Sequence, residues 1–139
     1  MTSNKTLKDL AEQMRGIDIA MLSTITEGGY IAGRPMSNNG EVEYDGTSYY
    51  FTNEDTRTVS DIRREPKVAL AFQGKDTFSL AVEGQATLSQ DKGEMKDHWT
   101  PDLDKWFEGG IETPGLTLIT VVAERAHYWA KGDEGEVTI

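Results

Sequence analysis

Residues 49–68, YYFTNEDTRTVSDIRREPKV, constrain the fold more than any other stretch of this chain. The aromatic and β-branched run 49–52 suits a pleated, half-buried backbone and predicts a strand. The polar residues that follow favour a turn, after which Val59 and Ile62 lie at helical spacing. Pro66 ends the helix, because the residue before a proline is driven out of the helical region. The stretch therefore predicts a strand, a polar turn, a short helix and the start of another strand.

The helix of this stretch is expected to begin near Thr56 and Arg57, directly after a strand. Free backbone N–H groups and the positive end of the helix dipole point outward at a helix start. A threonine hydroxyl and a guanidinium beside them would make an anion site, most naturally for a phosphate. A solvated turn with a surface arginine has the same pattern and is the commoner arrangement. Spacing alone leaves both interpretations open.

Short apolar or alternating runs separated by turns fill most of the remaining chain. We expect a helix carrying Leu7, Leu10 and Met14, further helices at 91–99 and 101–107, and strands at 19–25, 30–36, 67–73, 77–89, 116–123 with an extension over 126–131, and 137–139. Pro35 lacks a ladder N–H, so its strand is expected at a sheet edge, while Gly84 predicts a bulge and Asp45–Gly46 a hairpin turn. About six or seven strands with tight turns predict a mainly β fold, a small β-barrel with flanking helices. We expect one domain over residues 1–139.

The charge balance argues against several classes of partner. The chain has a formal charge of −10 and a pI of about 4.6, so we expect it to bind neither a nucleic-acid backbone nor an anionic membrane. It has no cysteine, which excludes disulfides, thiol catalysis and iron–sulfur clusters and fits a reducing compartment. The N-terminal MTSNKTLKDL lacks the apolar core of a signal peptide, and no apolar run is long enough to span a membrane. We therefore expect a cytoplasmic protein.

Few residues suggest chemistry on their own. His98 and His127 each lack a second ligand at metal-site spacing, so no metal is expected. The chain has no nucleophile elbow, P-loop or dinucleotide-binding glycine motif. Its three tryptophans, Trp99, Trp106 and Trp129, suit either a core or a subunit interface. Together with an anion corner, they would also suit a flat ligand with a phosphate tail.

Several short motifs occur in an order and spacing that resemble the flavin-binding split-barrel superfamily that includes pyridoxamine 5′-phosphate oxidase. The motifs are Arg34–Pro35–Met36, Phe51–Thr52, Thr56–Arg57 before a helix ending in Glu65–Pro66, Val82–Glu83–Gly84 and Tyr128–Trp129. Within that superfamily the chain is most similar to the general stress protein family of FMN-binding proteins. The resemblance covers nearly the whole chain and implies the FMN-binding type of split β-barrel.

The resemblance also implies a homodimer that holds FMN at the subunit interface. Transferred position by position, it implies that the flavin contacts come from Arg34, Pro35, Met36 and Ser37 along the isoalloxazine ring, Phe51 and Thr52 near the ribityl chain and phosphate, Thr56 and Arg57 at the phosphate, Ser79 where the oxidase has a flavin-contacting glutamine, and the partner subunit's Trp129.

The end of the chain departs from the oxidase pattern. In the oxidase the segment after the matching tryptophan supplies basic residues and a histidine for the phosphorylated substrate, whereas here it reads AKGDEGEVTI. A second phosphate needs cationic partners, so we do not expect pyridoxamine 5′-phosphate oxidase activity. An FMN-dependent oxidoreductase of another substrate, a non-catalytic flavin-binding stress sensor or carrier, and a deazaflavin or haem binder on the same fold stay open.

Overall fold

The structure is a computed structural model that describes residues 5–38 and 44–139. Its centre is a seven-stranded antiparallel sheet. The strands are β1 (Ile19–Ile25), β2 (Ile31–Ser37), β3 (Thr47–Asn53), β4 (Lys67–Gln73), β5 (Ser79–Ser89), β6 (Leu116–Ala130) and β7 (Asp133–Thr138). The helices are α1 (Leu7–Met14), α2 (Arg57–Arg64) and α3 (Lys92–His98), with 3-10 turns η1 (Pro101–Lys105) and η2 (Gly110–Glu112). The predicted mainly β class with intervening helices is confirmed.

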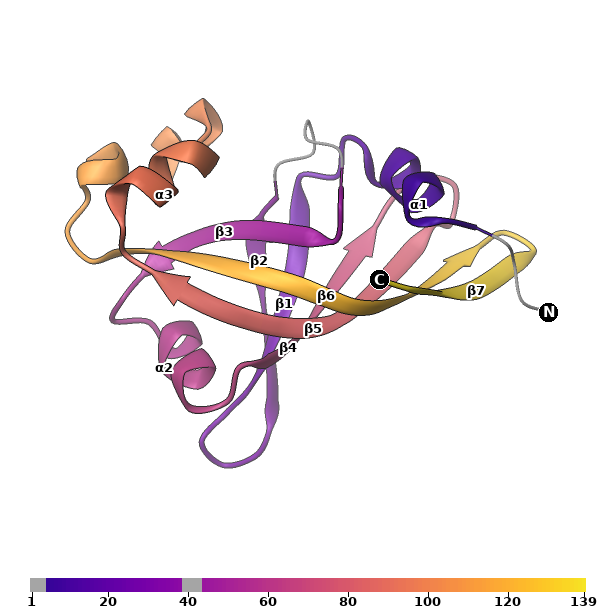
Figure 1. The fold of residues 1–139 in the computed structure, drawn as a ribbon, viewed down its shortest axis with the longest axis horizontal. Coiled ribbons are helices and arrows are strands. Elements are labelled where there is room, and N and C mark those ends of the chain that lie inside the picture. Colours follow the sequence, from indigo (N-terminus) through magenta and orange to yellow (C-terminus); the bar gives the residue numbers. More distant parts are fainter. Residues whose placement is uncertain (1–4, 39–43) are drawn as a thin grey trace.

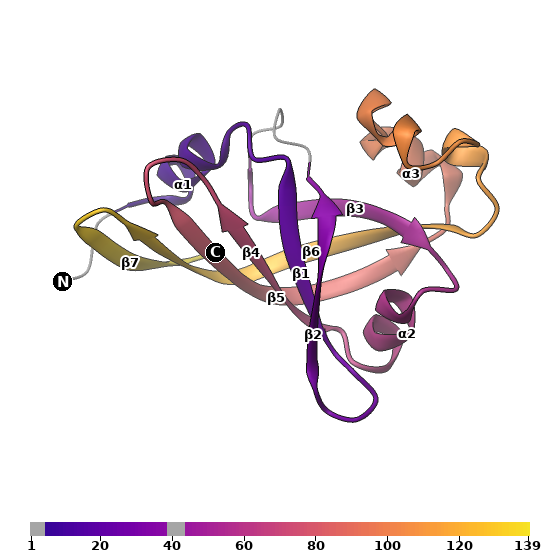
Figure 2. The same ribbon diagram turned by 180° about the vertical axis from the view of Figure 1, so that it is seen from behind.

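The sheet is open between two of its strands. The order is β2–β1–β4–β5–β6–β3, and β7 pairs with the second half of β6. Within the described residues β2 and β3 form no ladder with each other. Figures 1 and 2 show the β1–β2 hairpin crossing the direction of β3 and β6, so the sheet folds over on itself. The predicted barrel is therefore split: β2 and β3 come close to each other without pairing, and we call this opening in the sheet the gap between β2 and β3.

A bulge at Gly84 bends the sheet. Glu83 pairs with Arg125 and Gly84 with Ala123, so the register shifts by one residue. A Cβ atom at position 84 would lie only 2.2 Å from the Val122 carbonyl oxygen, a distance that only glycine avoids. Beyond the bulge β6 changes its outer neighbour from β3 to β7. The predicted bulge is confirmed, and it allows one long strand to serve two parts of the sheet.

Two predictions about strand connections are wrong. Gly46 does form a turn at φ +102, but β3 pairs with β6 instead of β2, so Asp45–Gly46 is not a hairpin. The connection before it includes residues 39–43, which lie outside the described residues. At the C-terminus the sequence predicts a turn from Gly132 to Gly135 before a strand at 137–139. The turn instead covers only Lys131 and Gly132, with Gly132 at φ +75, and β7 already begins at Asp133. Its polar residues hid this strand, because an exposed strand needs few apolar side chains.

The hydrophobic core has two parts. The larger cluster lies between the sheet and α1 and α2, with Leu10, Tyr50, Ile62 and Leu70 among its buried members. A smaller cluster packs α3 and η1 against the ends of β3 and β6 through Phe51, Met95, Leu103, Leu116 and Leu118. Each such side chain contributes about 1.5–3 kcal/mol when fully buried. The smaller cluster holds the α3 segment beside the gap between β2 and β3.

Candidate functional site

The N-terminus of α2 has the geometry that the sequence predicts. Thr56 is the N-cap, and its Oγ1 accepts a hydrogen bond from the Val59 N–H at 3.4 Å. The same hydroxyl donates to the Asn53 carbonyl at 2.9 Å, so its hydrogen atom already has an acceptor within the chain. Thr56 therefore sets the start of the helix. The first N–H groups of α2 have no intrahelical acceptor and point past its end, where Arg57 is exposed.

A buried carboxylate on α2 gathers polar groups from three elements. Asp61 Oδ2 accepts a hydrogen bond from Thr24 Oγ1 at 2.8 Å and lies 3.7 Å from Arg34 Nη2. Arg34 Nη1 in turn donates to Thr24 Oγ1 at 2.8 Å. Arg64 Nη2 donates to Asp61 Oδ1 at 3.2 Å and to the Ile25 carbonyl at 2.9 Å. This network fastens α2 to β1 and β2.

The network holds more positive than negative charge. Burial raises the pKa of Asp61, but hydrogen bonds from Thr24 and Arg64 and the charges of Arg64 and Arg57 outweigh it, so this pKa lies below its ordinary value. Burial lowers the pKa of Arg34; the Asp61 charge opposes that shift, and the Arg57 charge adds to it. We call Arg34, Arg57, Arg64, Asp61 and the start of α2 the cationic corner. It favours an anion, although the whole chain carries a charge of −10.

The end of β2 and the end of β3 meet at one cavity. Ser37 and Phe51 both line a space of about 540 Å³. Phe51 is buried in the smaller core cluster, while Thr52 is half-buried and pairs with Thr117 of β6. Two of the predicted ring and ribityl contacts therefore come together, although β2 and β3 are far apart in the order of the sheet.

Strand alternation separates the other candidates. On β2, Arg34 faces Asp61 and Met36 is buried in the core, while Pro35 is exposed on the outer face. Ser79 and Trp129 are direct partners in the β5–β6 ladder, and the Trp129 side chain is 43% exposed. Trp129 also pairs with β7, which lies at the opposite end of the molecule from α3 (Figure 1). Within one chain, Ser79 and Trp129 therefore do not reach the cavity beside Ser37.

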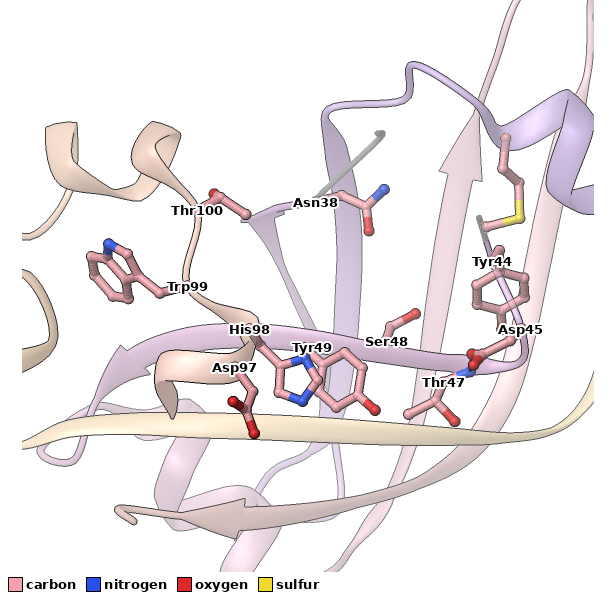
Figure 3. A pocket seen from close by; sticks show the side chains of 11 residues that line it. Asn38, Tyr44, Asp45, Thr47, Ser48, Tyr49, Asp97, His98, Trp99 and Thr100 are labelled. Carbon is pink, nitrogen blue, oxygen red and sulfur yellow. Dashed lines mark hydrogen bonds between the residues drawn. The ribbon is translucent and has the colours of Figure 1, made fainter. Parts of the chain in front are cut away.

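A second cavity of about 380 Å³, which we call the α3 cavity, adjoins the first. The two share Asn38, Tyr49, His98 and Thr100 as lining residues. The rings of Tyr49 and His98 stack with centroids 3.5 Å apart and an angle of 11° between their planes (Figure 3). Asn38 is held in place, because its amide donates to the Ile17 carbonyl at 2.8 Å and accepts from Tyr50 Oη at 3.2 Å.

Sequence reasoning missed Asp61 and the role of His98. Asp61 had a local signal: it lies on the same helical face as Thr58 and Ile62, which are buried, so a charge there needs partners. His98 had none, because its contact with Tyr49 joins segments that are distant in the sequence. The other histidine, His127, lies 2.8 Å from Glu134 through its Nε2. In residues 5–38 and 44–139 no group of three or more potential ligands could hold a metal ion.

Comparison with known proteins places this fold in a family. A family model described as pyridoxamine 5′-phosphate oxidase like matches residues 5–139. The chain belongs to the pyridoxamine 5′-phosphate oxidase-like family. Protein bli-3 of Neurospora crassa is 27% identical over 133 residues, a match that covers 88% of this chain and only 63% of that protein.

Solved structures agree with the pyridoxamine 5′-phosphate oxidase-like assignment. A Clostridium acetobutylicum protein related to general stress protein 26 superposes with a TM-score of 0.83 at 24% identity, covering 96% of this chain and 94% of its own. The general stress FMN/FAD binding protein of Xanthomonas citri superposes with a TM-score of 0.77 at 23% identity, covering 92% and 90%. The resemblance to this superfamily and its split-barrel fold are therefore confirmed. No helix of the described residues is long and apolar enough to cross a membrane.

Proposed function

We propose that this member of the pyridoxamine 5′-phosphate oxidase-like family is an FMN-binding flavoprotein that acts as an oxidoreductase. The phosphate would bind at the cationic corner, and the isoalloxazine ring would lie along the gap between β2 and β3. The observation that carries this proposal is the convergence of Arg34, Arg57 and the start of α2 beside that gap.

The cationic corner suits a phosphate for reasons of charge and geometry. Helix N–H groups and guanidinium forks are the donors that phosphate oxygens prefer. Asp61 keeps Arg34 in place, with their charged atoms 3.7 Å apart, while Arg57 stays exposed and available to a ligand. The structure gives Thr56 the role of helix cap, so its contribution would be to position these donors.

The gap beside the corner suits a flat heterocycle. As a terminal strand of the described sheet, β2 leaves one row of backbone N–H and C=O groups outside the ladder. Those groups can hydrogen-bond the polar edge of an isoalloxazine ring. The adjoining cavity offers the Phe51 and Tyr49 rings as apolar walls. Pro35, which has no N–H, interrupts that row only once.

A flavoprotein of similar fold supports the choice of ligand, since the Xanthomonas citri relative is named as an FMN/FAD binding protein. FMN, when bound, would supply the redox chemistry, and the chain would hold and orient it. The α3 cavity of about 380 Å³ leaves room for a second molecule next to the ring site. That room favours an oxidoreductase over a sensor or carrier without turnover.

We further propose that the site is completed in a homodimer through the outer face of the sheet. The ladder aligns Pro35, Met21, Ala71, Ala81 and His127 in one row across five strands. Met21 and Trp129 on this face are 42% and 43% exposed, and a partner subunit docked on this face would cover them. The partner's Trp129 would then approach the flavin. Light scattering should report a dimer, and a monomer that still binds FMN would contradict the shared site.

Titration of FMN into the apo protein and into Arg57→Ala tests the flavin proposal. Loss of the charge-assisted contact should weaken binding by about 1.5–3 kcal/mol. Arg63→Ala is the matched control, because Arg63 is an exposed arginine on the same helix and should leave affinity unchanged. Equal dissociation constants for all three proteins would refute the assignment of Arg57. The visible spectrum of the purified protein separates FMN from haem and deazaflavin.

A further inference from the structure

The formally charged side chains that line the α3 cavity are all acidic. Asp45 lies two residues before β3, and Asp97 lies near the end of α3 beside His98. In Figure 3 the Tyr49–His98 stack lies between these two carboxylates. The adjoining cavity adds Asp18 and Asp102. A ligand in this space would therefore meet carboxylates from more than one side.

Cations that could neutralise these carboxylates are scarce. The described lining of both cavities contains no lysine or arginine. Lys105 lies 3.7 Å from Asp102, but Asp45 and Asp97 have no ion-pair partner in the part of the chain that the structure describes. The electrostatic potential in the α3 cavity is therefore negative.

Aromatic rings give this space a flat wall. Tyr49 and His98 form a stacked pair, and Trp99 follows directly on the chain. Trp99 is fixed by an edge contact with Phe51 at 5.0 Å between ring centroids and by a hydrogen bond from Nε1 to Asp104 Oδ1 at 3.1 Å. Flat aromatic walls bind planar groups, and their ring faces attract cations. Shape and charge thus select for the same kind of molecule.

We propose that the α3 cavity binds an organic cation with a flat aromatic ring, such as a protonated arylalkylamine, and that this is the substrate class of the proposed flavin site. The inference rests on the proposed function, because the larger cavity that joins the α3 cavity to Ser37 and Phe51 would border the flavin ring. A metal ion is a poor fit, because no three potential ligands of the described chain come together. A phosphorylated substrate is a poor fit, because like charges would repel it.

Three probes of similar shape test the charge preference: benzylammonium, benzyl alcohol and benzoate. Each is titrated by calorimetry into the FMN-loaded protein at one ionic strength. Benzylammonium should bind best and benzoate worst, with at least about a tenfold difference between them, since each carboxylate contributes roughly two- to fivefold. Added salt should reduce the preference. Equal binding of the three probes, or no binding of any, overturns the proposal.

Variants then locate the effect. Asp45→Asn and Asp97→Asn should each lower the preference for benzylammonium roughly two- to fivefold, and the double variant more. Asn can keep the contact in which Asp45 Oδ1 accepts from the Thr47 N–H, and Asp97 is exposed, so both variants should fold. Asp76→Asn removes the same charge from the exposed β4–β5 turn and should change nothing. An unchanged preference in the double variant overturns the assignment of the α3 cavity.

A separate measurement distinguishes this failure from failure of the flavin proposal. FMN binding is followed by its absorbance before any probe is added, and the probe titrations are repeated on the apo protein. Tight FMN binding without charge selection would overturn the substrate class alone. Charge-selective probe binding in a protein that does not bind FMN would overturn the proposed function, and with it the role of the cation as a flavin substrate.

Discussion

The cationic corner and the α3 cavity lie near opposite ends of β3 and use aspartate in opposite ways. At the corner, Asp61 is buried and receives hydrogen bonds from Thr24 and Arg64. At the α3 cavity, Asp45 and Asp97 are exposed and no basic side chain of the described chain pairs with them. Burial therefore makes one carboxylate a structural anchor for arginines, while exposure leaves the others free to act on a ligand. The net charge of the chain, −10, therefore does not predict which of the two regions attracts an anion and which a cation.

The largest expected effect is a loss of folding stability when the buried carboxylate is removed, compared with removal of an exposed one. Asp61→Ala should lower the free energy of unfolding by about 3 kcal/mol, because it removes the ion-pair partner of the half-buried Arg34 and the acceptor of the buried Thr24 hydroxyl. Asp97→Ala should change it by less than about 0.5 kcal/mol, as expected for an exposed surface residue.

Urea denaturation measures both changes. Circular dichroism of each variant before the titration serves as the control for folding. Similar losses for the two variants would break the comparison, since they would mean that burial does not separate the two roles.

A smaller effect should appear in acid. The pKa of Asp61 is lower in the folded protein than its unfolded value of about 3.9, so its stabilising contribution is complete above that value. The contribution is lost as pH falls through the folded pKa. Below about pH 4 the wild type should therefore lose stability more steeply than Asp61→Asn, while above about pH 5 the difference between them should stay constant. Urea midpoints over a pH series check this, and parallel curves throughout would show that Asp61 carries no such linkage.

The last prediction is the absence of a reaction with a phosphorylated amine. Pyridoxamine 5′-phosphate should not bleach the flavin of the FMN-loaded protein under anaerobic conditions. The phosphate would be repelled by Asp45 and Asp97 in the α3 cavity. The charged side chains of the C-terminal segment after Trp129 are all acidic except Lys131. Stopped-flow absorbance with dithionite as the positive control measures it. Rapid bleaching would show that the phosphorylated substrate binds at a positively charged site other than the acidic α3 cavity.

The sequence by itself determined the elements whose causes are local. The strands Ile19–Ile25 and Lys67–Gln73 have the predicted bounds, because apolar runs and adjacent turn residues define them. The start of α2 at Thr56 follows from a cap residue after a strand. The bulge follows from Gly84, where a side chain would strike the neighbouring backbone. The motifs from Arg34 to Trp129 were likewise sufficient to indicate the pyridoxamine 5′-phosphate oxidase-like family, which the family match confirms.

Tertiary structure decided what depends on contacts between distant segments. It paired β3 with β6 instead of β2, turned Arg34 inward to Asp61 and laid His98 on Tyr49. It also separated Pro35 from Arg34, since alternate residues of a strand face opposite sides of the sheet. Periodicity shows which face of an element is apolar but not which other element covers it. The predicted flavin contacts were therefore named from the sequence, whereas their division between a cationic corner, a cavity and an outer face required the fold.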